Sequence, residues 1–344
     1  MRHVVLGKTG LTVSATGIGG IPIQRVSLPQ AVKTIHAALE MGITFIDTAA
    51  AYTDSQTKIG AAIKGRRDGL VIASKSGQKT KDGILADVAR ARKELGCETI
   101  DLFQFHNIST PAGWAAVSGP GGAMEGLLQA REKGHIAHIG FSSHNLDMAL
   151  KLIHEPVFET IQFSFNLVTA EAADQLIPQC RKNQVGFIAM KPLCGGQYEN
   201  AAFAFKYLNG FPDVVPIPGV ESPEQVRQIV DIVNSGATLQ GPEKVEADKI
   251  SASLGKLFCR RCGYCQPCPQ GVPIANVMVF EGFLRRFPLA KILEGPGKGV
   301  IENSGLCNEC GQCEEKCPYQ LPIRENIKRM GALARKFAAE HGRK

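Results

Sequence analysis

Several features are missing from this 344-residue sequence, and each absence argues against a class of protein. No run approaches the roughly 18 consecutive apolar residues of a membrane-spanning helix, so we expect none. The N-terminus, Met1-Arg2-His3-Val4-Val5-Leu6-Gly7-Lys8, lacks the apolar h-region of a secretory signal, and we expect a cytoplasmic chain. A GxGxxG fingerprint is also absent, which argues against a Rossmann dinucleotide site.

Cysteine, by contrast, is concentrated in one segment: eight of the 11 cysteines fall between residues 259 and 317. They form two runs, Cys259-x2-Cys262-x2-Cys265-x2-Cys268-Pro269 and Cys307-x2-Cys310-x2-Cys313-x3-Cys317-Pro318. A cysteine at every third position lets a short, turning backbone direct several thiolates to one point. Two four-thiolate zinc sites and a disulfide framework are the alternatives. Zinc ribbons, however, keep their cysteine pairs well apart, and disulfides need an oxidising compartment.

The second run resembles the one with which bacterial ferredoxins hold [4Fe–4S] clusters, and the first is one residue shorter before its final Cys-Pro. The resemblance implies two [4Fe–4S] clusters. In two-cluster ferredoxins the fourth cysteine of each run ligates the other cluster. By that rule one cluster is held by Cys259, Cys262, Cys265 and Cys317, and the other by Cys307, Cys310, Cys313 and Cys268.

The formal net charge of +7 does not indicate a nucleic-acid partner. It counts cysteines as neutral, and two clusters held by thiolates would cancel over half of it. The remaining basic residues gather in the C-terminal tail and around Lys64, Arg66 and Arg67, without aromatic interleaving or a binding motif. Solvated helix faces explain them.

Short apolar runs alternate with amphipathic stretches from residue 15 to about residue 236. Strands alternating with helices of this length predict a parallel sheet, and eight such units suit a closed (β/α)8 TIM barrel. The predicted strands are Ala15–Gly20, Thr44–Ala49, Leu70–Lys75, Ile100–His106, Ala137–Ser143, Thr160–Asn166, Gly186–Pro192 and Val214–Gly219. The clearest predicted helices are Pro29–Met41, Ser55–Lys64, Ala86–Leu95, Ala123–Lys133 and Pro223–Val233.

The pattern changes after residue 236, which predicts three parts in the chain. Residues 1–240 form the barrel part, and a hairpin around Gly7-Lys8-Thr9-Gly10 lies within it, before the first barrel strand. Residues 241–255 form a linker helix, and residues 256–344 form a small, mainly helical ferredoxin-type domain closed by a C-terminal helix, Ile323–Ala339.

Four ionisable residues follow or close successive predicted strands: Asp47, Tyr52, Lys75 and His106. Catalytic groups of such barrels lie at the C-terminal strand ends, so we expect these four on one rim. A phenol with a pKa near 10 is a poor acid at neutral pH, and a neighbouring ammonium lowers that pKa. Tyr52 is therefore the predicted acid or base, Lys75 tunes it, Asp47 holds Lys75 charged, and His106 orients a carbonyl oxygen.

The segments around these residues resemble the aldo/keto reductase family, in particular its branch with a C-terminal ferredoxin-type domain. They include Phe45-Ile46-Asp47-Thr48-Ala49, Ile72-Ala73-Ser74-Lys75, Asp101-Leu102-Phe103-Gln104-Phe105-His106 and Ile217-Pro218-Gly219. The resemblance covers roughly residues 1 to 240 and implies the four residues above as a catalytic tetrad.

The same resemblance implies a nicotinamide cofactor. Its carboxamide would contact Ser142, Ser143 and Gln162, and its ring would lie against Met190, followed by Lys191, where many members have an aromatic ring. The adenosine end would lie near Gly219, Val220, Glu221, Gln225 and Gln228. Because the basic residues that usually bind a 2′-phosphate are not at their expected places here, the cofactor is expected to be either NADP or NAD.

These observations predict an NAD(P)-dependent oxidoreductase that interconverts a small carbonyl and its alcohol. The alternative is an electron-transfer module, in which the ferredoxin-like domain exchanges electrons with a ferredoxin or another partner and the barrel serves as a docking or modified redox platform.

Overall fold

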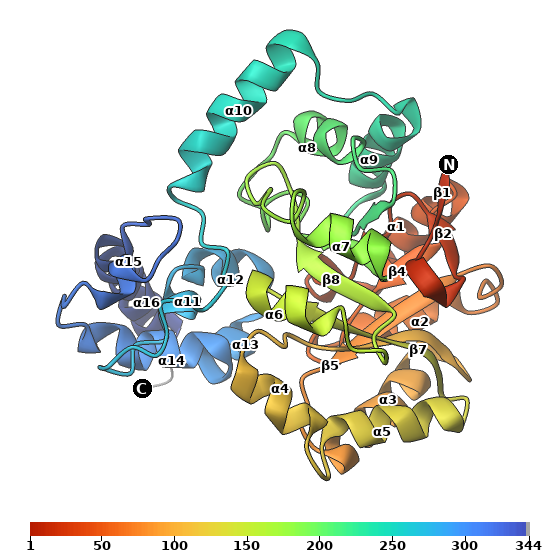
Figure 1. Cartoon of the computed structure of the whole chain (residues 1–344), viewed down its shortest axis with the longest axis horizontal. Coiled ribbons are helices and arrows are strands. Elements are labelled where there is room, and N and C mark those ends of the chain that lie inside the picture. Colours follow the sequence, from red (N-terminus) through yellow and green to blue (C-terminus); the bar gives the residue numbers. More distant parts are fainter. Residues whose placement is uncertain (342–344) are drawn as a thin grey trace. The chain divides into compact units, whose positions relative to one another are not determined.

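The computed structural model describes residues 1–341 of the chain, apart from the side chain of Arg286 (Figure 1). The chain divides into two compact units, Met1–Ala247 and a second unit that begins at Asp248. The helix α10, Gly241–Gly255, runs across this boundary. Among residues 1–341, no helix is both long enough and apolar enough to cross a membrane.

The first unit is built on eight parallel strands that follow one another around the sheet in chain order. All eight predicted strands are present, and the predicted (β/α)8 fold is confirmed. Their bounds are β3 Ile18–Gly19, β4 Phe45–Asp47, β5 Val71–Ser76, β6 Ile100–Phe105, β7 Ile136–Ser143, β8 Thr160–Ser164, β9 Gly186–Met190 and β10 Val214–Pro216. Every residue of β4, β5, β8 and β10 is buried, as expected of strands whose side chains pack both inside the barrel and against the helices outside it.

The barrel closes where the first and last strands meet. Gly17 N donates to Pro216 O at 2.9 Å and Gly19 N to Pro218 O at 2.8 Å, and Gly19 bridges Gly219 in parallel. A Cβ atom on Gly19 would lie 2.9 Å from the carbonyl oxygen of Ile217, which directly follows the last strand. The seam therefore needs glycine, because a side chain there would push the two strands apart.

Helices follow the strands and cover the sheet (Figure 1). Several begin at a side chain that accepts a backbone N–H, which satisfies a donor left open at the helix start. These caps are Ser27, Thr80, Thr110, Asn145, Asn200 and Ser222. The helices of the first unit are α1 Leu28–Glu40, α2 Ser55–Ile63, α3 Lys81–Leu95, α4 Pro111–Ser118, α5 Ala123–Glu132, α6 Leu146–Leu152, α7 Leu176–Lys182, α8 Ala201–Leu208 and α9 Pro223–Ser235.

The predicted N-terminal hairpin is present as β1, His3–Val5, and β2, Thr12–Ser14, joined by a 3₁₀ turn at Gly7–Thr9. The turn lies at the N-terminal end of β9, where Lys8 N donates to Gln184 O at 2.6 Å. Gly7 has a φ of +54°, and a Cβ on it would lie 2.3 Å from Gln184 O and Gly186 N. Only glycine fits this close approach of two backbones.

The second unit is helical, and no strand occurs among its described residues, 248–341. Its helices are α11 Ile274–Val277, α12 Phe280–Arg286, α13 Leu289–Glu294, α14 Pro296–Asn303, α15 Gln312–Glu315 and α16 Ile323–His341. A separate apolar core, with Val277, Phe280, Val300, Ile327 and Ala334 fully or almost fully buried, holds them together. Six of the eight clustered cysteines pack against this core, which places the two cysteine runs on its surface.

The Gly7 turn gives a test of how the hairpin is attached. We expect Gly7→Ala to destabilise the barrel by about 2–3 kcal/mol, because the left-handed φ costs about 1–2 kcal/mol and the contact with the β9 backbone adds to it. The control is Gly10→Ala, where φ is +71° but nothing lies within 4 Å of the added Cβ. Urea unfolding should show the smaller loss for Gly10→Ala; equal losses would contradict the close approach.

Candidate functional site

The centre of the candidate site is an ion pair between Lys75 and Asp47. Lys75 Nζ lies 2.6 Å from Asp47 Oδ2 and donates a second hydrogen bond to Thr48 O at 2.6 Å. Both residues are 1% exposed. The parallel register of β4 and β5 pairs Asp47 with Ala73, two residues before Lys75 on the same face of β5. The fold itself therefore brings this pair together.

Burial lowers the pKa of the Lys75 ammonium, and the neighbouring Asp47 carboxylate opposes that shift. Burial likewise raises the pKa of Asp47, which Lys75 and hydrogen bonds from Gln162 and Gln104 oppose. Each charge is costly to bury by itself, so each group depends on the other to stay ionised.

Tyr52 and His106 lie beside this pair. Lys75 Nζ is 5.2 Å from the centroid of the Tyr52 ring, and the Tyr52 and His106 rings meet edge to face with centroids 5.8 Å apart. Tyr52 is 8% exposed and lies in the loop between β4 and α2, whereas His106 directly follows β6. The structure thus gathers all four predicted tetrad residues at the C-terminal ends of β4, β5 and β6.

Gln104 is a polar residue of this site that the sequence analysis missed. It is fully buried in β6, in register with Lys75, and its amide donates to Asp47 Oδ1 at 3.3 Å and to Gln162 Oε1 at 3.1 Å. The predicted residue Gln162 is thereby linked to the ion pair. The available signal was a glutamine within the apolar half of the strand, between Phe103 and Phe105 and two residues before His106.

The loop after His106 is fixed by the predicted residues Ser142 and Ser143. Ser142 Oγ accepts from Asn107 N at 2.8 Å, while Ser143 Oγ contacts Ser109 Oγ at 3.3 Å. Asn107 has a φ of +70°, which turns the chain sharply after the histidine. Both serines are almost fully buried at the end of β7. In the structure their hydroxyls hold the backbone that carries His106.

The remaining predicted cofactor residues lie after β9 and β10. Met190 is the last residue of β9, and Lys191, with a φ of +58°, turns the chain, its carbonyl accepting from Asn166 Nδ2 at 2.8 Å. Gly219 lies at the barrel seam, Val220 is buried, and Gln228 is exposed on α9.

Glu221 has a partner that the sequence did not reveal. Arg25, which follows β3 in the chain, forms an ion pair with the Glu221 carboxylate. The side chain of Gln225 accepts from Glu221 N at 2.7 Å, which fixes the start of the loop into α9. A basic group therefore does lie in this region, although 196 residues of chain separate it from Glu221.

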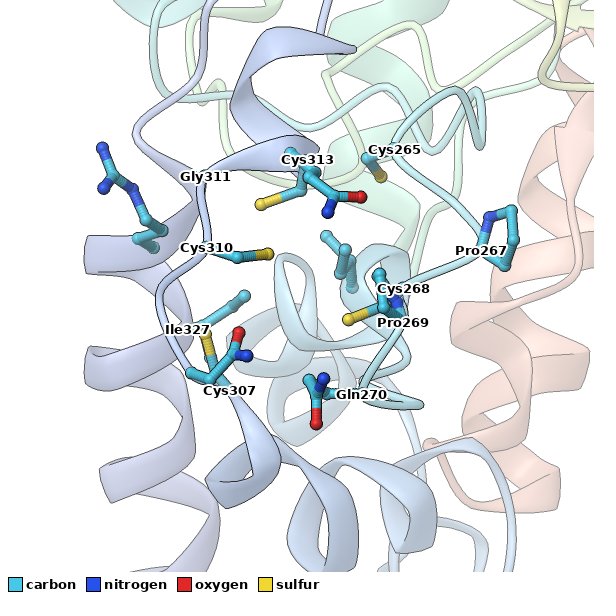
Figure 2. Close-up of a pocket in the computed structure, with 14 residues that line it drawn as sticks. Cys265, Pro267, Cys268, Pro269, Gln270, Cys307, Cys310, Gly311, Cys313 and Ile327 are labelled. Atoms are coloured by element: carbon cyan, nitrogen blue, oxygen red, sulfur yellow. The ribbon is translucent and has the colours of Figure 1, made fainter.

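The cysteine runs surround two cavities in the second unit. The first is lined by Cys265 and Cys268 of the first run and by Cys307, Cys310 and Cys313 of the second (Figure 2). The second is lined by Cys259, Cys262 and Cys265 of the first run and by Cys317 of the second. Three cysteines of one run and the fourth of the other thus line each cavity, with Cys265 in addition at the first, and the crossed arrangement that the ferredoxin resemblance implies is compatible with this lining. Cys265 and Ile274 line both cavities.

The two runs share one backbone conformation at their first pair of cysteines. Arg261 and Glu309, each before the second cysteine, have φ values of +61° and +59°, and Gly263 and Gly311, each after it, have +85° and +82°. A repeated left-handed pair of this kind turns the backbone around the cavity in both loops.

The four thiols of one cavity interact electrostatically. Burial raises the pKa of Cys265, and the neighbouring Cys259, Cys262 and Cys317 act in the same direction, so that together they bring it to about 12. Four thiolates around one space therefore require a cationic centre, whose binding releases their protons. Among residues 1–341, no three His, Cys, Asp or Glu side chains converge tightly enough for a single metal ion. Soft thiolate donors arranged around a wider space fit an iron–sulfur cluster.

Comparison with known proteins agrees with both parts of this description. Residues 13–202, more than half of the chain, match the aldo/keto reductase family, and the chain belongs to that family. Residues 258–322 match the 4Fe-4S dicluster domain.

The aldo-keto reductase YhdN of Bacillus subtilis is 29% identical over 215 residues, which are 57% of this chain. The chain covers 63% of that relative, so it spans less than two thirds of the relative's length. Two solved structures share the barrel fold. The aldo-keto reductase AKR11C1 of Bacillus halodurans, in its holo form, covers 73% of this chain and 96% of its own, with a TM-score of 0.61 and 21% identity. An aldo-keto reductase of Klebsiella pneumoniae in complex with NADPH covers 73% and 95%, with the same TM-score and identity.

The buried ion pair predicts a characteristic pattern of stability. Lys75→Met or Asp47→Asn alone leaves one buried group without its counter-charge, and we expect each to cost about 3–5 kcal/mol of unfolding free energy. The double variant Lys75→Met with Asp47→Asn removes both charges and should recover much of that loss. Urea unfolding of the three variants gives the coupling energy. Losses that simply add would show that the pair does not interact.

Proposed function

We propose that this protein is an NAD(P)-dependent oxidoreductase that interconverts a small carbonyl compound and its alcohol by hydride transfer, and that its second unit holds two [4Fe–4S] clusters. The observation that carries the first part is the gathering of Asp47, Lys75, Tyr52 and His106 at one rim of the barrel, with the ion pair almost fully buried. Family membership supports it independently.

In this proposal Tyr52 exchanges a proton with the substrate oxygen. The Lys75 ammonium, close to the ring, stabilises the phenolate that remains when Tyr52 gives up its proton. Asp47 keeps Lys75 charged, and Gln104 holds the Asp47 carboxylate in place. His106 donates a hydrogen bond to the oxygen, where negative charge develops. When bound, the nicotinamide supplies or accepts the hydride.

The residues after β9 and β10 are the proposed cofactor contacts. Met190 can pack its thioether against the nicotinamide ring. A related barrel has been solved with NADPH, which supports the phosphorylated cofactor. In this chain, however, Arg25 at the proposed adenosine end is paired with Glu221, and a carboxylate there favours a free ribose hydroxyl. We therefore propose NADP or NAD.

Replacing Tyr52 tests the proposed acid. We expect Tyr52→Phe to lower carbonyl reduction by at least about 10²–10⁴-fold, the usual contribution of a positioned general acid, and to leave nicotinamide binding intact. The control is Tyr207→Phe, which lies in α8 against Phe165 and Phe211 and should retain turnover. Steady-state oxidation of NADPH and of NADH with a panel of small aldehydes measures the effect. Undiminished turnover by Tyr52→Phe would exclude the role.

The crossed cysteine pairing predicts which double cysteine replacements lose more iron than the single replacements. Two [4Fe–4S] clusters bring about eight iron atoms per chain, and losing one cluster removes about four. Cys259→Ser with Cys317→Ser should lose no more iron than either single variant, because both line one cavity. Cys259→Ser with Cys268→Ser should lose both clusters. Iron and sulfide analysis after anaerobic purification decides between them, and the reverse pattern would contradict the pairing.

The alternative function, an electron-transfer module, is favoured by one observation: Cys265 and Ile274 line both cavities, so the two clusters would lie close enough to exchange electrons. Turnover that requires a reduced ferredoxin or a viologen dye, and that is absent with NADPH and NADH, would select it. Aldehyde reduction that persists after the clusters are removed would select the first function.

A further inference from the structure

The two cysteine loops share a backbone but carry different charges. Between its first two cysteines the loop at Cys259 has Arg260 and Arg261, whereas the loop at Cys307 has Asn308 and Glu309. The matching φ values at Arg261 and Glu309 put these residues at equivalent positions around their cavities. The loop at Cys259 therefore carries two positive charges, whereas the loop at Cys307 carries one negative charge.

The arginine side chains are held against their cavity. Arg260 is 7% exposed, donates from Nη1 to Gly255 O at 2.6 Å and to Phe258 O at 2.9 Å, and stacks 3.9 Å from the centroid of the Tyr319 ring. Tyr319 follows Cys317 by two residues, so this contact joins the two segments that supply thiolates to one cavity. Arg261 donates to Asn276 Oδ1 at 3.2 Å, and both arginines line the cavity.

The other loop is exposed, and its charges are paired. Asn308, Glu309 and Cys310 are exposed, and Glu309 forms an ion pair with Lys328 at 2.8 Å. Arg324 lines this cavity but binds Glu314 at 2.8 Å. Water and counter-charges therefore screen the charges of this exposed loop far more than they screen the charge of the buried Arg260.

We propose that Arg260 makes the two clusters unequal, so that the cluster at Cys259, Cys262, Cys265 and Cys317 has the higher reduction potential and takes the first electron. This inference depends on the two clusters of the proposed function. One-electron reduction changes [4Fe–4S]²⁺ to [4Fe–4S]⁺ and makes the site more negative, which a nearby buried cation stabilises. The cluster beside Cys310 is then the lower-potential one, at the exposed loop where an external donor can deliver electrons.

The test is a redox titration of the full chain with dithionite, followed by electron paramagnetic resonance. We expect two waves, and Cys310→Ser, which removes a thiolate from the other cavity, should abolish the lower one. Arg260→Gln should move the upper wave to lower potential and leave the other in place, while Arg260→Lys, which keeps the charge, should stay nearer the wild type. At the equivalent position of the other loop, Asn308→Arg should raise the lower wave.

The outcomes separate this inference from the proposed function. A wild-type chain without iron and sulfide overturns the clusters and the inference together. A loaded wild-type chain in which Arg260→Gln moves neither wave, or moves the wave that Cys310→Ser abolishes, overturns the inference alone. If Arg260→Gln loses its cluster, Arg261→Gln and Asn308→Arg decide. An upper wave lowered by Arg261→Gln and a lower wave raised by Asn308→Arg support the inference. If neither variant moves its wave, the inference is overturned.

Discussion

The barrel depends on one electrostatic constraint, the need to compensate a lysine charge that is almost completely withdrawn from water. Lys75 satisfies it with the carboxylate of Asp47, the last residue of the neighbouring strand β4, and with the carbonyl of Thr48, the residue after it. This arrangement works only if β4 and β5 keep their register, since a shift of one residue would turn Lys75 away from Asp47. The same pair places a positive charge next to the Tyr52 ring. Structure and proposed chemistry therefore depend on the same contact.

Much of this arrangement could be predicted because it follows from strand order. The C-terminal ends of parallel strands lie on one edge, so residues at successive ends must come together. Strand ends were harder to predict. The strand expected to reach Pro192 stops at Met190, because Lys191 adopts a left-handed φ and proline has no N–H for the ladder. The helix expected from Ala86 begins at Lys81, because Thr80 caps it, a signal that apolar periodicity does not contain.

Other features could not be predicted because they join residues that are distant in sequence. Arg25 and Glu221 meet only because the barrel closes the first strand against the last. Ser142 was expected to face a cofactor, and in the structure its hydroxyl accepts the backbone N–H of Asn107, the residue after His106 in the loop that follows β6. Gln104 on β6 joins Asp47 on β4 to Gln162 on β8, and each of these partners lies two strands away in the sheet. Side-chain hydrogen bonding of this kind depends on three-dimensional neighbours, whereas the strand pattern depends on local sequence.

The proposed function combines two kinds of redox chemistry that do not exchange electrons directly. A hydride carries two electrons together, while each [4Fe–4S] cluster takes one. Two clusters have the capacity for the electrons of one hydride, but a nicotinamide releases both at once, so the transfer needs an intermediary such as a flavin. If the clusters only held the second unit together, thiolates at the right places would be enough. Loops with matching φ values and opposite charge would instead give the two proposed clusters unequal potentials, which suits stepwise delivery by a one-electron partner at the exposed loop.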